Sequence, residues 1–304
     1  MFGKYHHPLG NLKRMFDSTK PKPQQHIYFS PHLDDAIYSC GGRIFRQRSH
    51  GEAVTVLNFL AGHPPEGTLT PFAQQYHSMW GNASEPIALR LEEDARALGL
   101  WKIQAIYWNT SDAIYRKVNQ EAVYPDLSAL FGPPHPEDAQ ILMRFWENAW
   151  YDLGFIPEQV HLYAPLAAGN HVDHVLVREF AKWLKQQGWQ VWFYEDFPHA
   201  YDTITLQKAL TEFGDVKWHC FTELIDVKEK IKAMRMYESQ ISMMFADRED
   251  MEKRVKDFTA ERAAAIHWGE RLRKLLAGSG GRRERIWRWV FGYQAYAERY
   301  WSYS

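Results

Sequence analysis

The sequence has few cysteines and no long apolar run. Its 304 residues include only Cys40 and Cys220, which are too few for a disulfide framework and show no spacing typical of a zinc cluster. No stretch of about 18 consecutive apolar residues occurs, and the N-terminal residues lack the apolar core of a secretion signal. We therefore expect no transmembrane segment and a location in the reducing cytoplasm.

The sequence also lacks an excess of either charge. Lysine and arginine number 36 against 37 acidic residues, which gives a formal net charge of −1. This balance produces no overall field that would attract a polyanion, so we expect no nucleic-acid partner. With 45% hydrophobic and 24% charged residues, the composition is that of a globular protein with a sizeable core.

Short apolar runs alternate with helical patterns after residue 25. The runs expected to form strands are 27–30, 53–60, 105–108, 160–164 and 190–194. Residues 90–98 read as a helix, and the spacing of apolar residues from Val177 to Leu184 predicts a helix that ends near Gly188. Strands separated by helices predict an α/β fold, with a Rossmann-like, mostly parallel sheet and helices on both faces.

The chain divides into three expected regions. Residues 1–25 form an N-terminal arm, residues 26–225 the α/β catalytic domain, and residues 226–304 a helical C-terminal extension that packs on the same domain. No strand pattern is evident in the extension. Its arginines around the glycine break at 278–281 are interpreted as solvated helix faces, with a patch for an anionic substrate or a membrane surface as the alternative. The proline-rich stretch 124–138 predicts a long loop, with residues 135–138 exposed.

Two compact polar clusters each follow a predicted strand. The first runs from Pro31 to Asp35, after the strand 27–30, and the second from His171 to His174, beyond the strand 160–164. Ligands and catalytic groups collect at the carboxyl ends of strands in an open α/β sheet, so both clusters are expected on one rim. His32 and Asp35 are three residues apart, as are His171 and His174, so each pair projects to one side of a helical first turn.

Imidazoles and a carboxylate together suit zinc or iron(II). Two histidines and one carboxylate leave a coordination position open for water, which is typical of a catalytic site. A further carboxylate beside the ligands can act as the base, because the metal lowers the pKa of its water to about 7. Asp34 is the candidate. The alternatives are that Asp34 only caps a helix and that the second cluster is ordinary helix-start chemistry.

These residues resemble a known family. The sequence PHLDD at 31–35, followed by CGG at 40–42, and the sequence HVDH at 171–174 are similar to motifs of the PIG-L/LmbE-like zinc-dependent N-deacetylases, which remove acetyl groups from N-acetylglucosamine conjugates. The resemblance covers most of the chain. It implies a metal site in which His32, Asp35 and His174 bind zinc, or alternatively iron(II).

The same resemblance implies roles for the neighbouring residues. Asp34 would be the general base and later the acid, a protonated His171 would stabilise the oxyanion, and Asp173 would orient an imidazole. Arg90 and Asp112 would hold the sugar hydroxyls, with a surface charge and a turn carboxylate as the alternative interpretation.

Two acidic residues follow the predicted strand 190–194. Glu195 and Asp196 are expected on the same rim, where they would bind substrate or support the ligands, although Asp196 could instead cap a helix. Five further histidines have no partner at metal-ligand spacing and are interpreted as surface or core residues: His6, His7, His63, His77 and His199.

We therefore expect a zinc-dependent hydrolase. It would remove the N-acetyl group from a small-molecule N-acetylglucosamine-type conjugate, through attack by a metal-activated water with an Asp general base. The alternatives are a metal-dependent amidase that acts on a non-sugar amide and a non-catalytic metal- or sugar-binding protein. Asp34 argues against the latter, since a binding protein needs no base beside the metal. A homo-oligomer is compatible with the resemblance.

Overall fold

The computed structural model describes residues 25–80, 85–264 and 295–304. Residues 1–24 of the expected arm and the arginine-rich segment around 278–281 lie outside these ranges. Within them, no helix is long and apolar enough to cross a membrane.

The described residues form a seven-stranded mixed sheet in the order β3-β2-β1-β6-β7-β9-β8. Its five parallel strands are β1 (Gln25–Ser30), β2 (Ala53–Asn58), β3 (Gln104–Tyr107), β6 (Val160–Pro165) and β7 (Gln190–Tyr194). All five were predicted to within a few residues. The central strand β1 is buried on both faces, as expected of a parallel strand between two helix layers.

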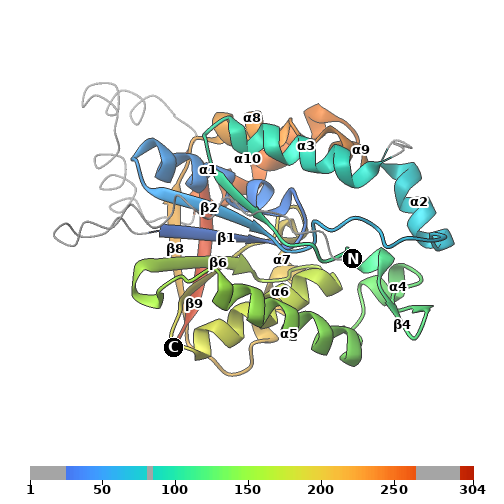
Figure 1. Cartoon of the computed structure of the whole chain (residues 1–304). Coiled ribbons are helices and arrows are strands. Elements are labelled where there is room, and N and C mark those ends of the chain that lie inside the picture. The colour runs from blue at the N-terminus through green and yellow to red at the C-terminus, as the bar shows by residue number, and fades with distance from the viewer. Residues whose placement is uncertain (1–24, 81–84, 265–294) are drawn as a thin grey trace, which may run out of the picture.

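Helices cover both faces of the sheet, which confirms the predicted architecture (Figure 1). One layer contains α1 (Asp35–Ser49), α3 (Pro86–Gly99), α8 (Val227–Met234) and α10 (Arg248–Ala264). The other contains α5 (Pro136–Asp152) and α6 (Val172–Gln186), the latter being the helix predicted to end near Gly188. Aromatic rings fill the space under this second layer, where Phe29 meets the edges of Phe59 and Trp150 at 5.0 and 5.6 Å between ring centroids.

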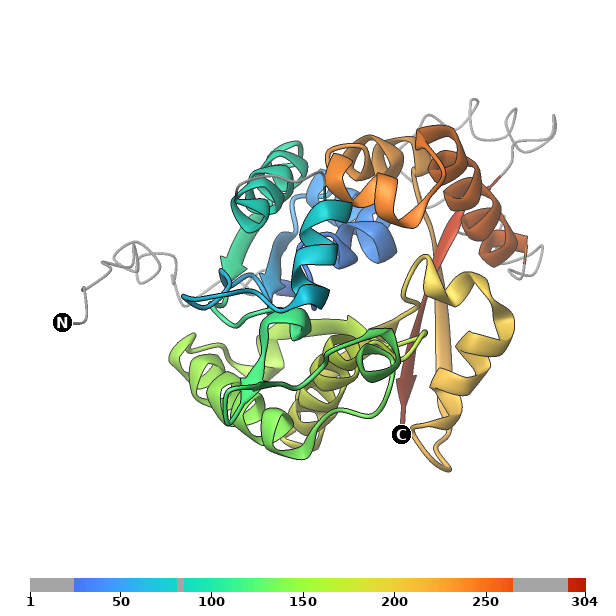
Figure 2. The same ribbon diagram turned by 90° about the vertical axis from the view of Figure 1, so that its right-hand side faces the viewer.

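Small elements gather at the end of the sheet towards which β1 and β6 run. They are α2 (Pro71–Met79), α4 (Leu127–Leu130), α9 (Glu238–Met244), the hairpin of β4 (Lys117–Val118) and β5 (Glu121–Ala122), and the 3-10 turn Ala113–Tyr115. Figure 2 views the molecule from this end. Further elements are α7 (Thr203–Thr211) and two other 3-10 turns, Pro157–Gln159 and His199–Tyr201.

The C-terminal part contains the expected helices, but it is not helical throughout. Strand β9 (Ala297–Tyr303) lies between β7 and β8 (Trp218–Leu224) and is antiparallel to both. The expectation of no strand was wrong here because β9 carries charged residues whose partners lie on other elements: Glu298 pairs with Lys230 at 2.7 Å and Arg299 with Glu195 at 2.8 Å. The last strand therefore completes the sheet of the preceding region.

The stretch 124–138 is not one long loop. It contains α4, and α5 begins at Pro136, a residue well suited to the first turn of a helix. Asp138, expected to be exposed, is buried and accepts hydrogen bonds from Arg116 Nε at 3.0 Å and from the Tyr124 hydroxyl at 2.9 Å. His135 is exposed as predicted.

Candidate metal centre

Three predicted ligands meet at the carboxyl ends of β1 and β6. Asp35 Oδ2 lies 3.3 Å from Nδ1 of His32 and 3.2 Å from Nε2 of His174. The ligand atoms of these three residues all lie within 4.8 Å of one another. Atoms about 2.0–2.1 Å from a tetrahedral ion lie roughly 3.3 Å apart, so the measured spacing fits such an ion. Residues far apart in the chain thus converge on one point, as the motifs predicted.

Carboxylates behind the two imidazoles fix which nitrogen of each ring faces that point. His174 Nδ1 lies 2.8 Å from Asp196 Oδ1, which leaves Nε2 towards Asp35. His32 Nε2 lies 3.0 Å from Asp173 Oδ2, which leaves Nδ1 towards Asp35. A carboxylate behind a ligating histidine is the usual means of setting its tautomer and orientation. The geometry fits the expected orienting role of Asp173, and Asp196 lies behind His174 in the same way.

The electrostatics of the cluster favour a cation. Burial lowers the pKa of His174, but the carboxylates of Asp35 and Asp196 outweigh this effect and raise it to about 10. Burial likewise lowers the pKa of His32, and the acidic neighbours led by Asp112 raise it well above its usual value. Groups that hold protons this firmly lie in a strongly negative field, which would also hold a divalent ion in place of the protons. The donor set and the field therefore both fit zinc or iron(II).

Asp34 stands beside the ligands and is not used as a helix cap. It occupies the N-cap position of α1, but its side chain makes no capping hydrogen bond and is buried. Its Oδ1 lies 3.3 Å from Nη2 of Arg90. Burial and then the carboxylate of Asp35 raise the pKa of Asp34, against the opposing effect of Arg90. A carboxylate with a raised pKa is better suited to accept a proton than an ordinary surface aspartate.

His171 lies across from His32, with ring centroids 5.0 Å apart and the rings nearly perpendicular. It is the N-cap of α6, and its Nδ1 accepts a hydrogen bond from the backbone N–H of Asp173 at 3.2 Å. Burial lowers the pKa of His171 well below its usual value. With Nδ1 accepting, Nε2 is the ring nitrogen left to donate. The expectation of a protonated His171 stays a prediction, which the lowered pKa does not favour.

Arg90 and Asp112 border the same point. Arg90 Nη1 lies 4.0 Å from Asp112 Oδ2, and the guanidinium lies 4.8 Å above the Trp80 ring, which holds it in place. Asp112 Oδ2 is also 3.5 Å from Nε2 of His32. Both predicted substrate contacts are thus beside the ligands and the candidate base.

Glu195 is placed differently from its expected role. Its Oε2 accepts from Arg262 Nε at 2.8 Å, and its Oε1 accepts from Trp301 at 3.0 Å and pairs with Arg299 at 2.8 Å. Both carboxylate oxygens are therefore occupied by the C-terminal part of the chain. Glu195 anchors that part to the end of β7, and we leave it out of the proposed site.

The loop between β6 and α6 has an unusual backbone. Ala167, Gly169 and Asn170 all have positive φ, at 61°, 91° and 61°. A Cβ atom at Gly169 would approach the His199 ring to 2.8 Å. Backbone conformations of this kind cost free energy and cluster at functional sites. His199, interpreted from the sequence as an ordinary surface or core residue, packs here against His174 at 6.3 Å between ring centroids.

Asp173 is held by a buried charged pair, Arg116 and Asp138, that the sequence analysis did not assign to the site. Arg116 Nη1 lies 2.7 Å from Asp173 Oδ1, and Asp138 holds the other side of the same guanidinium. Although burial raises the pKa of Asp173, Arg116 lowers it to below its usual value. Arg116 lies four residues after the predicted site residue Asp112, whereas Asp138 was expected in an exposed loop, so the sequence offered a signal for Arg116 but none for Asp138.

Comparisons with known sequences agree with this geometry. The model of a family described as PIG-L, GlcNAc-PI de-N-acetylase, matches residues 27–184, more than half of the chain. A 2'-N-acetylparomamine deacetylase of Niallia circulans is 28% identical over 185 residues, which are 57% of this chain and 66% of that protein. The chain thus matches slightly less than two thirds of this relative's length.

Solved structures share the fold. A deacetylase of the teicoplanin biosynthesis pathway and the zinc-inhibited form of a teicoplanin deacetylase each have a TM-score of 0.67 and 19% identity, covering 92% of this chain and 98% of theirs. The pseudoaglycone deacetylase Dbv21 has a TM-score of 0.65 and 20% identity, covering 93% and 98%. At this level of identity the likeness confirms the α/β fold alone.

Proposed function

Because the chain belongs to the PIG-L family of GlcNAc-PI de-N-acetylases, we propose that it is a zinc-dependent hydrolase that removes the N-acetyl group from an N-acetylglucosamine-type conjugate. The observation that carries the proposal is the convergence of His32 Nδ1, Asp35 Oδ2 and His174 Nε2 on one point. The carboxylate of Asp34, which makes no helix-capping hydrogen bond, lies beside them. The name of the curated relative, a deacetylase of an N-acetylated amino sugar, supports the substrate class.

The ligand set would hold zinc, with iron(II) as the alternative. A divalent ion there supplies a Lewis acid for the amide carbonyl and lowers the pKa of a bound water. The chain itself keeps the two imidazoles oriented through Asp173 and Asp196. Asp35 is held in addition by the backbone N–H of His32, at 2.8 Å from its Oδ2.

Asp34 transfers a proton from the attacking water to the leaving amine. As the base, its carboxylate takes a proton from the attacking water, and it returns this proton to the nitrogen of the leaving amine when the C–N bond breaks. Its raised pKa suits both directions of transfer. Arg90, at 3.3 Å, keeps the carboxylate in one position throughout.

His171 stabilises charge on the carbonyl oxygen. Its Nε2–H is the donor, because Nδ1 is occupied by the backbone N–H of Asp173. A donor placed before the reaction starts stabilises a developing oxyanion without having to reorient. Arg90 and Asp112 lie on the same side and would hold hydroxyl groups of the sugar.

Release of acetate from a set of substrates tests the proposal. The full chain is assayed with N-acetylglucosamine conjugates and with simple non-sugar acetamides, before and after treatment with a chelator and after zinc or iron(II) is restored. We expect acetate from the sugar conjugates only, loss of activity with chelator and recovery with metal. Turnover of the simple amides alone would support the amidase alternative, and turnover that persists in the chelated protein would refute the metal role.

A further inference from the structure

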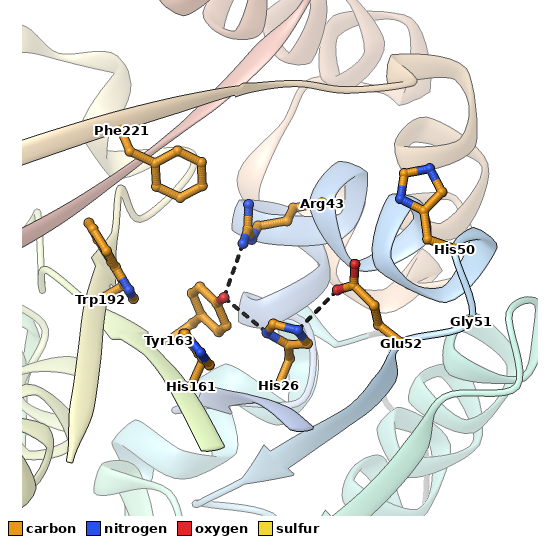
Figure 3. A pocket seen from close by; sticks show the side chains of 9 residues that line it. All are labelled: His26, Arg43, His50, Gly51, Glu52, His161, Tyr163, Trp192 and Phe221. Atoms are coloured by element: carbon orange, nitrogen blue, oxygen red, sulfur yellow. Dashed lines mark hydrogen bonds and ion pairs between the residues drawn. The ribbon is translucent and has the colours of Figure 1, made fainter. Parts of the chain in front are cut away.

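A pocket lies at the end of the sheet opposite the candidate metal centre. Its volume is about 620 Å³. It is lined by His26, Arg43, His50, Gly51, Glu52, His161, Tyr163, Trp192 and Phe221 (Figure 3). His26 and His161 stand near the starts of β1 and β6, whereas the metal ligands follow the ends of these strands. Six-residue strands separate the two sites by roughly 20 Å.

A chain of hydrogen bonds crosses the floor of the pocket (Figure 3). Arg43 Nη2 donates to the Tyr163 hydroxyl at 3.1 Å, this hydroxyl lies 3.1 Å from His26 Nδ1, and His26 Nε2 lies 3.0 Å from Glu52. Burial, then the positive charge of Arg43, lowers the pKa of His26 to about 3, so its ring is neutral. A neutral ring accepts a hydrogen bond from Tyr163 at Nδ1 and donates one to Glu52 from Nε2, so every group in this series of hydrogen bonds has a partner.

Two buried nitrogen atoms of the lining lack such partners. Nε of Arg43 and Nε2 of His161 are shielded from solvent and make no hydrogen bond with the described part of the chain. A buried polar atom without a partner costs on the order of 1–3 kcal/mol, and each one in a native structure requires an explanation. A ligand that supplies the missing partners is the explanation that the adjoining pocket offers.

Aromatic rings form the walls. Tyr163 and Trp192 occupy paired positions of β6 and β7, and the Phe221 ring lies 5.5 Å from that of Trp192. The Arg43 guanidinium lies 4.7 Å from the centre of the Phe221 ring. Apolar walls with a few convergent polar groups are typical of small-molecule sites of this size.

The charges around the pocket cancel. The guanidinium groups of Arg43 and Arg46 share the carboxylate of Glu223, and Glu52 is the second carboxylate, paired with the neutral His26. Donors and acceptors therefore occur together without a net charge. A neutral ring that carries several hydroxyl groups can both accept from Arg43 Nε–H and donate to Glu52, while its flat C–H face lies against the aromatic walls.

We propose that this pocket is a second ligand site that binds a neutral sugar ring. Arg43 and His161 provide the unused hydrogen-bonding atoms, and Trp192 provides the stacking surface. A neighbouring pocket of about 350 Å³ shares Arg43 and Phe221 with it and leaves room for a substituent on the sugar. The proposal does not depend on the deacetylase reaction.

Binding of methyl β-glucopyranoside tests the proposal, because this probe has no amide to hydrolyse. Its affinity is measured by saturation-transfer NMR and calorimetry on the full chain, with and without chelator. His161→Phe fills the pocket and removes an unpaired nitrogen, and His219→Phe makes the same change at an exposed position of β8. We expect binding to the unaltered protein and to His219→Phe, unchanged by chelator, and at least tenfold weaker binding to His161→Phe.

Four results would overturn the proposal. They are no binding of the glucoside, equal binding by His161→Phe, loss of binding with chelator, which would assign the sugar to the metal centre, and tighter binding of benzoate than of the glucoside, which would show that the pocket takes an anion. Thermal unfolding checks that each variant is folded. If His161→Phe is not, Trp192→Leu provides the same test through loss of the stacking surface. Acetate release is expected to stay unchanged in all these variants, so failure here is distinguishable from failure of the proposed reaction.

Discussion

Two regions of the molecule bury several charges, and they do so in opposite ways. At the anchor of the C-terminal part, each oxygen of Glu195 and Glu298 has its own donor: Arg262, Arg299 and Trp301 for the first, Lys230 and backbone N–H groups for the second. At the rim, the free nitrogen atoms of His32 and His174 both face one oxygen of Asp35. Charged groups that are each fully paired, which we call saturated, stabilise the fold. Charged groups that all face one point, which we call focused, are arranged to bind a further group.

This difference teaches how to separate structural from functional burial. Saturated pairs need their partners to remain stable, because removing one leaves the other charge buried and unpaired. A focused cluster is costly as it stands, so changes there are expected to affect activity more than folding. The following changes test that distinction in order of expected effect.

The largest effect is expected for Asp34→Asn. General acid–base catalysis contributes about 10²–10⁴-fold to rate, so kcat should fall within that range while thermal stability and metal content stay near those of the unaltered protein. Steady-state acetate release and metal analysis measure both quantities. An unchanged kcat would contradict the role of Asp34 as the base, and Asp126→Asn at an exposed helix cap serves as the control.

Arg262→Met should show the opposite behaviour. Its side chain is buried against Glu195, so its loss leaves an unpaired carboxylate and should lower the free energy of unfolding by about 3–5 kcal/mol. The kcat of the folded fraction should not change. Arg254→Met, on the exposed side of the same helix, is expected to cost less than about 1 kcal/mol. Chemical denaturation measures both, and equal stability of the two variants would remove the contrast between the regions.

His171→Phe should lower kcat by about 10²–10³-fold, the usual effect of losing one donor to an oxyanion. Because burial lowers the pKa of His171 well below its usual value, we expect the acidic limb of the pH–rate profile not to report a His171 titration. His135→Phe, at an exposed position, is the control. A variant whose kcat matches that of the control would show that the carbonyl oxygen is stabilised without His171.

Asp94 is an intermediate case, since neutral donors surround its carboxylate. The hydroxyls of Tyr107 and Tyr237 donate to it, both at 2.7 Å, yet burial raises its pKa to about 7. The folded state therefore binds this proton more firmly than the unfolded chain, and its contribution to stability falls as pH rises from about 4 to about 7, by up to about 1.4 kcal/mol per pH unit. Asp94→Asn should flatten this part of the stability profile, as measured by denaturation across pH. An unaltered slope would show that Asp94 is ionised throughout.

The smallest effect is expected for Trp80→Leu. Its ring supports the Arg90 guanidinium, and an interaction of this kind is worth about 0.5–2 kcal/mol, so kcat/KM should fall roughly two- to thirtyfold. Trp80→Phe keeps an aromatic face and should recover most of the loss. If Trp80→Phe is as impaired as Trp80→Leu, the ring does not act through Arg90.

The sequence predicted the focused region far better than the saturated one. Short motifs after two strands were sufficient to bring His32, Asp35 and His174 to one rim, because parallel strands end on the same side. The charges of β9 hid that strand, since their partners Lys230 and Glu195 lie on other elements and leave no local pattern. Asp138 was missed for the same reason: its burial depends on Arg116, 22 residues earlier in the chain.

The central claim is that one divalent ion binds between His32 Nδ1, Asp35 Oδ2 and His174 Nε2. Anomalous diffraction at the zinc absorption edge, from crystals of zinc-loaded protein, tests it most directly. The account predicts one strong peak within about 2.0–2.2 Å of these three atoms and no peak there in His174→Phe. A zinc peak elsewhere with none between these three residues, or a peak at this point that persists in His174→Phe, would contradict it.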